Sequence, residues 1–449
     1  MRASQDEPVM TLFDHRRLTN AVMKLDVDGF RRGIYSDKYF ENIVGVMNGA
    51  RAAGYTYSGS HPRDLDRDLR GLDVSDLIVE AQVFTRRAPY ALVAGVDAAL
   101  AMIRYATGCF EGDQFVERWG ALEVEAVEDG ALALYHGHPD DVRPVIRIRG
   151  RYQDFAVLET PILGILTRAS RIATSVYEVL KVSGGKPILF FPAPPICPTC
   201  RQSTAAAYWL AVQRYNAVDG GSTTPAVSTD AQGAWWGGKG GGTVPHALIA
   251  AFLGDTAEAM VAFAPLYLPV TVPRIALVDF NNDCVGASLA AAAFWQHYRA
   301  AFELDDDDGM RRWALNGVRL DTSGSVRDVS LTPDDPFGVN PKLVRLVRAA
   351  LDSAWQAWNV PDHLRDAARA FCRNIKIVVT GGFNAERIAE YEREGVPVDV
   401  YGVGSSLLRN DWATNTDFTM DVVRVRIDVG QRSKVGRAPN TTPISSRSI

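Results

Sequence analysis

Short apolar runs that end in polar or small residues recur along the second half of the chain. These runs lie at residues 188–191, 275–279, 318–321, 375–380 and 398–402. Between them, helical spacing of apolar positions occurs at residues 286–302, 341–358 and 385–394. Alternation of short buried strands with helices is typical of parallel βα units. We therefore predict an irregular TIM-like (β/α) barrel over residues 151–410, with ligand-binding residues at the carboxyl ends of its strands.

In the first third of the chain, apolar and polar positions follow a shorter period. Apolar and polar residues alternate at Glu80–Phe84 and Ile146–Gly150, which predicts strands of an antiparallel sheet. We predict a mixed α/β domain over residues 26–150, on which residues 411–437 pack. Residues 438–449 contain Ser, Thr and Pro and have no core to join, so we expect a flexible tail. The predicted fold class is α/β, with the barrel as the second domain.

The composition argues against two classes of partner. The 449 residues include 48 basic and 53 acidic side chains, and no basic block is present that would neutralise a nucleic-acid backbone. The longest apolar run, Ala91–Ala106, is interrupted by Asp97 and Arg104, which argues against a membrane span. The first residues lack the apolar stretch of a signal peptide. We expect a cytoplasmic protein with neither a nucleic-acid nor a membrane partner.

The cysteines do not predict a metal site. There are five, an odd number, and they are thinly spread, which favours reduced thiols over a disulfide framework. The pair Cys197 and Cys200 forms a single CxxC, and a structural zinc site needs a second pair of ligands. We interpret this pair as part of an ordinary loop and predict no metal ligands from the protein.

A glycine-rich stretch at residues 227–246 is the densest concentration of chemically useful side chains. It contains Asp230 and ends at His246, with Lys239 between them. Glycine lets the backbone approach a bound group closely and turn its N–H groups toward an anion. The stretch is not a Walker A loop, because Gly240 stands where the magnesium-binding Ser or Thr belongs. The apolar run after His246 predicts a helix whose N-terminus favours phosphate at that histidine.

The Gly-Thr-x-x-His ending of this stretch, with Thr243 and His246, resembles the nicotinate phosphoribosyltransferase family of type II phosphoribosyltransferases. Further short motifs of that family follow the same order along the chain. Arginine suits a phosphate or carboxylate because its guanidinium donates two parallel hydrogen bonds, and aspartate accepts from ribose hydroxyls. The matching motifs are Asp37-x-Tyr39, Glu159-Thr160, Arg319-x-Asp321, Gly381-Gly382 and Gly402-Val-Gly404-Ser405.

The resemblance implies a role for each matching residue. His246 would be transiently phosphorylated by ATP, and Arg319 and Asp321 would face the ribose and the base. Tyr39 would stack on the pyridine ring bound by a neighbouring subunit, although an aromatic that packs in a core is an equally good interpretation of that residue. Asp230 is assigned to catalysis, and substrate binding is assigned to Asp37, Thr243 and Arg201. The 5′-phosphate would be held by Gly381, Gly382, Gly402, Gly404 and Ser405.

The implied reaction transfers phosphoribose from phosphoribosyl pyrophosphate to nicotinate, coupled to ATP hydrolysis. Mg²⁺ would neutralise the departing pyrophosphate. The protein would be a homodimer with shared active sites, and its small-molecule partners would be nicotinate, phosphoribosyl pyrophosphate and ATP.

Two departures from the family pattern keep alternatives open. Many members have a second aspartate shortly after the position of Asp321. Residues Thr322 to Ser325 include no aspartate, so the role of that second carboxylate is assigned to no residue here. Prolines 194 and 195 stand where an aromatic and an arginine usually clamp the base, with Arg201 and Arg214 as the nearest substitutes. The chain would then act on another aromatic base. A third alternative is a non-catalytic homologue that binds a nucleotide.

Overall fold

A computed structural model describes residues 16–18, 23–59, 70–138, 141–191, 201–242, 244–266, 272–411, 414–425 and 439–444. The chain forms two compact units. Unit 1 comprises residues 1–177, 197–214 and 409–449, and unit 2 comprises residues 178–196 and 215–408. Residues 151–177 and 197–214 belong to the same unit as the N-terminal residues. The domain boundary near residue 150 stays a prediction.

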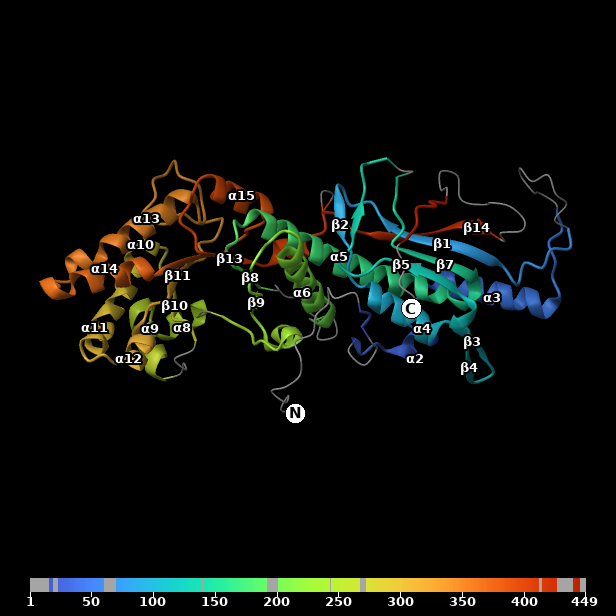
Figure 1. The fold of residues 1–449 in the computed structure, drawn as a ribbon, viewed down its shortest axis with the longest axis horizontal. Coiled ribbons are helices and arrows are strands. Elements are labelled where there is room, and N and C mark those ends of the chain that lie inside the picture. The colour runs from blue at the N-terminus through green and yellow to red at the C-terminus, as the bar shows by residue number, and fades with distance from the viewer. Residues whose placement is uncertain are drawn as a thin grey trace. The chain divides into compact units, whose positions relative to one another are not determined.

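Unit 1 is built on a four-stranded antiparallel sheet in the order β14-β1-β7-β5. The strands are β1 (Ile78–Thr85), β5 (Glu123–Ala126), β7 (Ile146–Arg151) and β14 (Phe418–Val425). Smaller hairpins pair β2 (Tyr90–Leu92) with β6 (Leu132–Leu134) and β3 (Gly108–Glu111) with β4 (Gln114–Glu117). Its helices are α2 (Val27–Arg31), α3 (Lys38–Ala53) and α4 (Val96–Ala106), and α5 (Glu159–Val182) and α6 (Arg201–Val218) begin in this unit. Figure 1 shows β1 between β7 and β14.

The alternation along β1 explains how unit 1 buries one face of its sheet. Val79, Ala81 and Val83 point to one side and join the apolar core with helix α4. The residues between them, Glu80 and Gln82, point to the other side and are also almost fully buried. Since a buried charge is tolerated only when it is paired, this second face must carry compensating groups.

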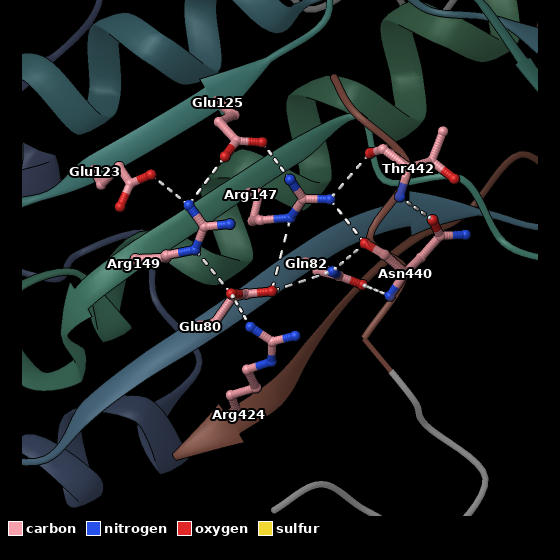
Figure 2. Close-up of polar contacts among 9 residues, drawn as sticks. All are labelled: Glu80, Gln82, Glu123, Glu125, Arg147, Arg149, Arg424, Asn440 and Thr442. Atoms are coloured by element: carbon pink, nitrogen blue, oxygen red, sulfur yellow. Dashed lines mark hydrogen bonds and ion pairs between the residues drawn. The ribbon is translucent and has the colours of Figure 1, made fainter. Parts of the chain in front are cut away.

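A charge network supplies that compensation (Figure 2). The Glu80 carboxylate lies 2.7 Å from Nε of Arg149, 3.7 Å from Nε of Arg147 and 3.6 Å from Nη1 of Arg424. Arg147 also contacts Glu125, so acidic and basic side chains alternate across the four strands. Removing Glu80 would take a buried carboxylate away from Arg147 and Arg149 while the guanidinium of Arg147 stays buried, which is destabilising.

Residues 439–444 lie on this network and differ from the expected tail without a core. Nη2 of Arg147 donates to the Asn440 carbonyl at 2.8 Å, and the Asn440 N–H donates to Oε1 of Gln82 at 3.2 Å. Ile444 is buried. The sequence does not reveal these contacts because the polar partners lie about 300 residues earlier in the chain.

Unit 2 contains a six-stranded parallel sheet in the order β10-β11-β12-β13-β8-β9. The strands are β8 (Ile188–Phe190), β9 (Ala226–Val227), β10 (Ile275–Leu277), β11 (Gly317–Leu320), β12 (Lys376–Val379) and β13 (Val400–Val403). The five predicted strands are confirmed, and β9 was not predicted. Within the described ranges, β9 and β10 form the two edges of an open sheet, so a closed TIM barrel is not confirmed.

Helices connect most of these strands. They are α7 (Asp230–Gly233), α8 (His246–Ala251), α9 (Thr256–Leu266), α10 (Cys284–Ala291), α11 (Trp295–Glu303), α12 (Asp307–Trp313), α13 (Pro341–Ser353), α14 (Arg365–Asn374) and α15 (Ala385–Arg393). The predicted helix at residues 286–302 is divided into α10 and α11 by a 3₁₀ turn at Ala292–Phe294. Figure 1 shows α10, α13 and α14 packed together beside β10 and β11.

Further 3₁₀ segments complete the two units. They are η1 (Trp119–Ala121), η2 (Tyr152–Asp154), η3 (Ala156–Leu158), η5 (Ala234–Trp236), η7 (Ala354–Ala357), η8 (Asp362–Leu364) and η9 (Ser405–Leu408). None of the helices that the structure describes is both long and apolar enough to pass through a bilayer.

Candidate functional site

The carboxyl ends of β10 and β11 place two carboxylates at the same edge of the sheet. Leu277 of β10 is in register with Arg319 of β11, so Asp279 and Asp321, each two residues further on, stand at equivalent positions. Val278 extends the pairing by donating its N–H to the Arg319 carbonyl at 3.1 Å. Parallel strands that end together gather their ligand-binding residues in this way.

His246 meets one of these carboxylates. It is the first residue of α8, and its Nε2 atom lies 3.0 Å from Oδ2 and 3.1 Å from Oδ1 of Asp279. The His246 side chain is 48% exposed, whereas that of Asp279 is 8% exposed. The histidine is therefore accessible to a ligand while its carboxylate partner is shielded from water.

Burial and neighbouring groups of opposite charge shift the pKa values of Asp279 and Arg319 in opposite directions. Burial raises the pKa of Asp279 above its ordinary value, although the hydrogen bond from His246 acts to lower it. Burial lowers the pKa of Arg319, and the negative charges of Asp321 and Asp279 oppose that effect. The guanidinium of Arg319 lies 3.7 Å from Oδ2 of Asp321 and donates to the Val244 carbonyl at 3.4 Å. Arg319 therefore also anchors the chain just before His246.

The turn after β12 is attached to one of these carboxylates. Oγ1 of Thr380 donates to Oδ1 of Asp321 at 2.6 Å. Gly381 and Gly382 follow with φ angles of +89° and +75°. Side chains other than glycine rarely adopt this left-handed region, so the turn requires its two glycines.

A second glycine turn, after β13, lies against the first. Oγ of Ser406 donates to the Phe383 carbonyl at 2.6 Å and joins the two turns. A Cβ on Gly402 would lie 2.4 Å from Cγ2 of Thr380, which only glycine avoids. Among the described residues, none accepts a hydrogen bond from five backbone N–H groups at these turns. These N–H groups belong to Gly381, Gly382, Phe383, Gly404 and Ser405.

Backbone N–H groups that lack a described acceptor, at two turns joined by a hydrogen bond, are of the kind that holds phosphate in many parallel α/β proteins. The predicted grouping of Gly381, Gly382, Gly402, Gly404 and Ser405 is consistent with this geometry. Gly402 differs in role, since it is buried inside β13 and makes room for Thr380.

Asp230 makes a hydrogen bond within its own loop. Its Oδ1 accepts the Gly240 N–H at 2.9 Å, which closes the glycine-rich stretch on itself. Cβ atoms on Gly233 and Gly240 would lie 2.8 Å and 2.6 Å from backbone atoms of Lys239 and Thr229, respectively. Several glycines of this stretch therefore permit close backbone packing. The structure shows no hydrogen bond or ion pair between Asp230 and His246, both of which it describes.

Asp37 and Tyr39 lie in unit 1, at the start of α3. Oδ2 of Asp37 accepts hydrogen bonds from the Tyr39 hydroxyl at 3.2 Å and from Oγ1 of Thr160 at 3.1 Å. The Asp37 N–H in turn donates to Oγ1 of Thr160 at 3.1 Å. Tyr39 is 59% exposed, so the core interpretation suits its neighbour Phe40 and does not suit Tyr39. The carboxylate holds the exposed ring in one orientation.

Glu159 lies beside Thr160 at the start of α5. Burial raises the pKa of Glu159 to about 7, and the Tyr152 hydroxyl donates to its Oε2 at 3.4 Å. Negative charge on Asp421 and Asp37 raises this pKa further. A carboxyl group that is partly protonated near neutral pH therefore lies in the segment that holds Asp37.

Several predicted residues fall outside the described part of the chain. These are Thr243 and residues 192–200, which include both prolines and the CxxC pair. Arg201 begins α6, but its side chain is also outside the described set. Arg214 donates to the Gly130 carbonyl at 2.6 Å. Within the described residues, no three His, Cys, Asp or Glu side chains are grouped to hold a metal ion.

Asp279 is the residue that sequence reasoning missed. It ends an apolar run in the same way that Asp321 does, and that position was the available signal. The contact with His246 comes from a helix 33 residues earlier in the chain, so no local pattern indicates it.

Comparison with known proteins finds one family match and several structures of similar fold. Residues 66–170 match the family described as quinolinate phosphoribosyl transferase, N-terminal domain. The structure resembles nicotinate-nucleotide pyrophosphorylase from Pyrococcus furiosus, with a TM-score of 0.59, 24% identity, and coverage of 92% of this chain and 80% of that one.

Two further solved structures are less similar. Human nicotinic acid phosphoribosyltransferase gives a TM-score of 0.46 and 17% identity over 87% of this chain and 75% of that one. NadC from Streptococcus pyogenes gives a TM-score of 0.46 and 14% identity over 90% and 97%. The match over residues 66–170 and the likeness in fold to the Pyrococcus furiosus structure bear out the resemblance to phosphoribosyltransferases that the motifs predicted.

Proposed function

We propose that this protein is a phosphoribosyltransferase of NAD biosynthesis that converts nicotinate and phosphoribosyl pyrophosphate to nicotinate mononucleotide and pyrophosphate, with coupled ATP hydrolysis. The observation that supports the proposal best is the contact between His246 and Asp279 at the strand edge that also carries Arg319 and Asp321. An accessible histidine with an oriented carboxylate partner is suited to nucleophilic chemistry.

In the proposed reaction the contact with Asp279 leaves Nδ1 as the reacting nitrogen of His246. When Nε2 carries the proton and donates it to Asp279, the lone pair of the neutral ring lies on Nδ1. Nδ1 attacks the γ-phosphorus of ATP, the bond from phosphorus to the bridging oxygen breaks, and ADP leaves. The phosphorylated ring retains its Nε2 proton and carries a positive charge, which the Asp279 carboxylate stabilises.

Transfer of phosphoribose requires charge neutralisation at both ends of the substrate. The backbone N–H groups of the two glycine turns that have no acceptor among the described residues would hold the 5′-phosphate. Asp321 would accept hydrogen bonds from the ribose hydroxyls. The base nitrogen attacks the anomeric carbon as the carbon–oxygen bond to pyrophosphate breaks. Carboxylates such as Asp279 and Asp321 fit Mg²⁺, which takes one or two of them together with substrate phosphates and would neutralise the leaving group.

The proposal includes a homodimer with shared sites. Tyr39 is exposed, Asp37 accepts from its hydroxyl and its ring contacts that of Phe40, so the exposed part of the ring would stack on a flat base held by a second copy of the chain. Stacking would exclude water from one side of the pyridine ring and strengthen the surrounding electrostatic interactions.

The family match favours one specific alternative. Because residues 66–170 resemble the N-terminal domain of quinolinate phosphoribosyl transferase, the base could be quinolinate, which carries a second carboxylate. A dicarboxylate needs an additional cationic partner, and no phosphohistidine is required to bind it. Another aromatic base is the broader alternative, because Pro194 and Pro195 stand where an aromatic and an arginine usually clamp the base.

One assay distinguishes these functions. Pyrophosphate release from phosphoribosyl pyrophosphate is measured across nicotinate, quinolinate, nicotinamide and other pyridines, each with and without ATP. We expect nicotinate to react fastest, stimulation by ATP, and acid-labile radiolabel from γ-labelled ATP that is lost in His246→Ala. Some transfer should survive in that variant at saturating substrate, since phosphorylation assists the transfer without forming part of it.

Turnover of quinolinate alone, without ATP, would favour the alternative. Absence of pyrophosphate release with every base would indicate a non-catalytic homologue.

A further inference from the structure

We infer that Arg387 is a positioning residue that orients the phosphate-binding turn after β12 through the carbonyl of Gly381. The inference rests on the proposed function, because it assigns a role within the same phosphate site. Arg387 belongs to none of the motifs that predicted that site.

Arg387 is held from three sides. On α15, its Nη1 donates to the Gly381 carbonyl at 2.8 Å and its Nη2 donates to the Val339 carbonyl. The guanidinium carbon lies 4.2 Å from the centre of the Phe383 ring, within the range of a cation–π contact. The Arg387 N–H donates to Oδ1 of Asn384, the N-cap of α15, at 2.9 Å. Its position relative to the turn is therefore well defined.

The contact with Gly381 determines where the next N–H points. In a trans peptide the carbonyl of one residue and the N–H of the next point in opposite directions. Since the Gly381 carbonyl points to Arg387, the Gly382 N–H points away from it. That N–H donates to none of the described residues and so remains available to an anion.

Without Arg387 the orientation of this peptide would be weakly determined. Gly381 and Gly382 both have positive φ angles, and glycine adopts left- and right-handed conformations with similar ease. Rotation of the peptide plane between them would replace the N–H donor with a carbonyl oxygen, which repels phosphate. The hydrogen bond from Arg387 selects the orientation that presents the donor.

Arg387 acts through the turn and does not itself supply the phosphate contact. Two of its guanidinium nitrogens already donate to the Gly381 and Val339 carbonyls, and its face covers Phe383. Because the effect is on phosphate, substitution should change the binding of phosphorylated substrate more than that of the base.

Two variants test the inference in the full-length protein. Arg387→Met keeps the length of the side chain and removes all donors, whereas Arg387→Lys keeps the charge and can reach only one carbonyl. We expect Arg387→Met to raise the KM for phosphoribosyl pyrophosphate and the Kd for ribose 5-phosphate about 10- to 100-fold, with smaller increases for Arg387→Lys. The KM for the base and kcat should change about twofold or less.

The matched control is Arg345→Met. Arg345 also donates to a carbonyl, that of Glu394 at 2.9 Å, and does not contact the glycine turns. It should leave the Kd for ribose 5-phosphate unchanged. A melting temperature for each variant separates loss of the fold from loss of the site.

The outcomes are distinguishable. If Arg387→Met binds ribose 5-phosphate as tightly as the wild type, or if its KM for the base and its kcat change as much as its KM for phosphoribosyl pyrophosphate, Arg387 does not position the turn. If the wild type binds ribose 5-phosphate but transfers to no base, the proposed function fails while the inference about Arg387 remains testable by calorimetry.

Discussion

The Nε2 atom of His246 lies 3.0 Å from Oδ2 of Asp279, which joins the first residue of α8 to the chain that follows β10. The carboxylate is buried and the imidazole is half exposed, so a shielded Asp279 holds a His246 ring that a ligand can reach. A partner that orients a histidine in this way commonly has a large effect on its reactivity.

The first prediction concerns Asp279→Asn. The amide oxygen can still accept from Nε2 but brings no charge, so it stabilises a phosphorylated, cationic ring less well. We expect ATP hydrolysis and acid-labile labelling to slow by about 10- to 100-fold, with transfer at saturating substrate partly retained. Asp255→Asn is the control, because Asp255 is exposed and accepts the Glu258 N–H at 2.9 Å, a role that asparagine fills equally well. Labelling of Asp279→Asn at the wild-type rate would exclude the pair from the phosphorylation step.

The second prediction concerns recognition of the carboxylate of the base. Arg319→Gln should weaken nicotinate binding by about 1–3 kcal/mol, because the substrate carboxylate would lose its charged partner inside a desolvated site. Arg201→Gln tests the second candidate for this role. Nicotinamide, which has no carboxylate, serves as the matched ligand whose KM should change less. If nicotinate is not turned over and a neutral base is, the protein acts on another base.

The third prediction tests whether sites are shared between subunits. Tyr39→Ala and His246→Ala should each be inactive or impaired and should complement one another after co-expression. In a mixed dimer one site would carry both substitutions and the other neither, so random pairing should restore about a quarter of the wild-type activity. Differently tagged chains establish that mixed dimers have formed. No recovery in purified mixed dimers would place both residues in the site of one chain.

The fourth prediction concerns pH and the stability of unit 1. The pKa of Glu159 is raised to about 7 in the folded protein, so the folded state favours the protonated carboxyl group. The associated stability is present below the ordinary pKa of 4.5 and is lost as the pH rises through about 7. Glu159→Gln does not ionise and should avoid this loss.

Melting temperatures at about pH 5 and about pH 8 measure the effect. Relative to the wild type, the free energy of unfolding of Glu159→Gln should rise by about 1–3 kcal/mol between the lower and the higher pH, and its melting temperature should rise accordingly. Glu111→Gln, at an exposed carboxylate of the same unit, should show no such shift. A difference between Glu159→Gln and the wild type that is independent of pH would show that the carboxyl group does not titrate in this range.

The sequence by itself determined five of the six strands of unit 2 and most of the residues at their ends. Short apolar runs bounded by turn residues are typical of buried strands; Arg319 lies within one such strand and Asp321 and Gly381 follow the strand ends, so their place near the sheet edge is a local property. The same reasoning located the antiparallel strands β1 and β7, since a period of two is visible in the sequence. ATP coupling, Mg²⁺, the base and the dimer remain predictions.

Only the tertiary structure decided which of these residues meet. Asp279 contacts His246 across 33 residues, and Thr160 fixes Asp37 across 123 residues. Hydrophobic periodicity specifies which face of an element is buried, but it carries no information about which distant segment returns to cover that face. The pairing of β14 with β1 and the position of Arg387 behind the glycine turn depend on such returns. Such contacts are not visible in the sequence, because two side chains that pair across a sheet or a turn need only complementary chemistry. They do not have to share a sequence pattern.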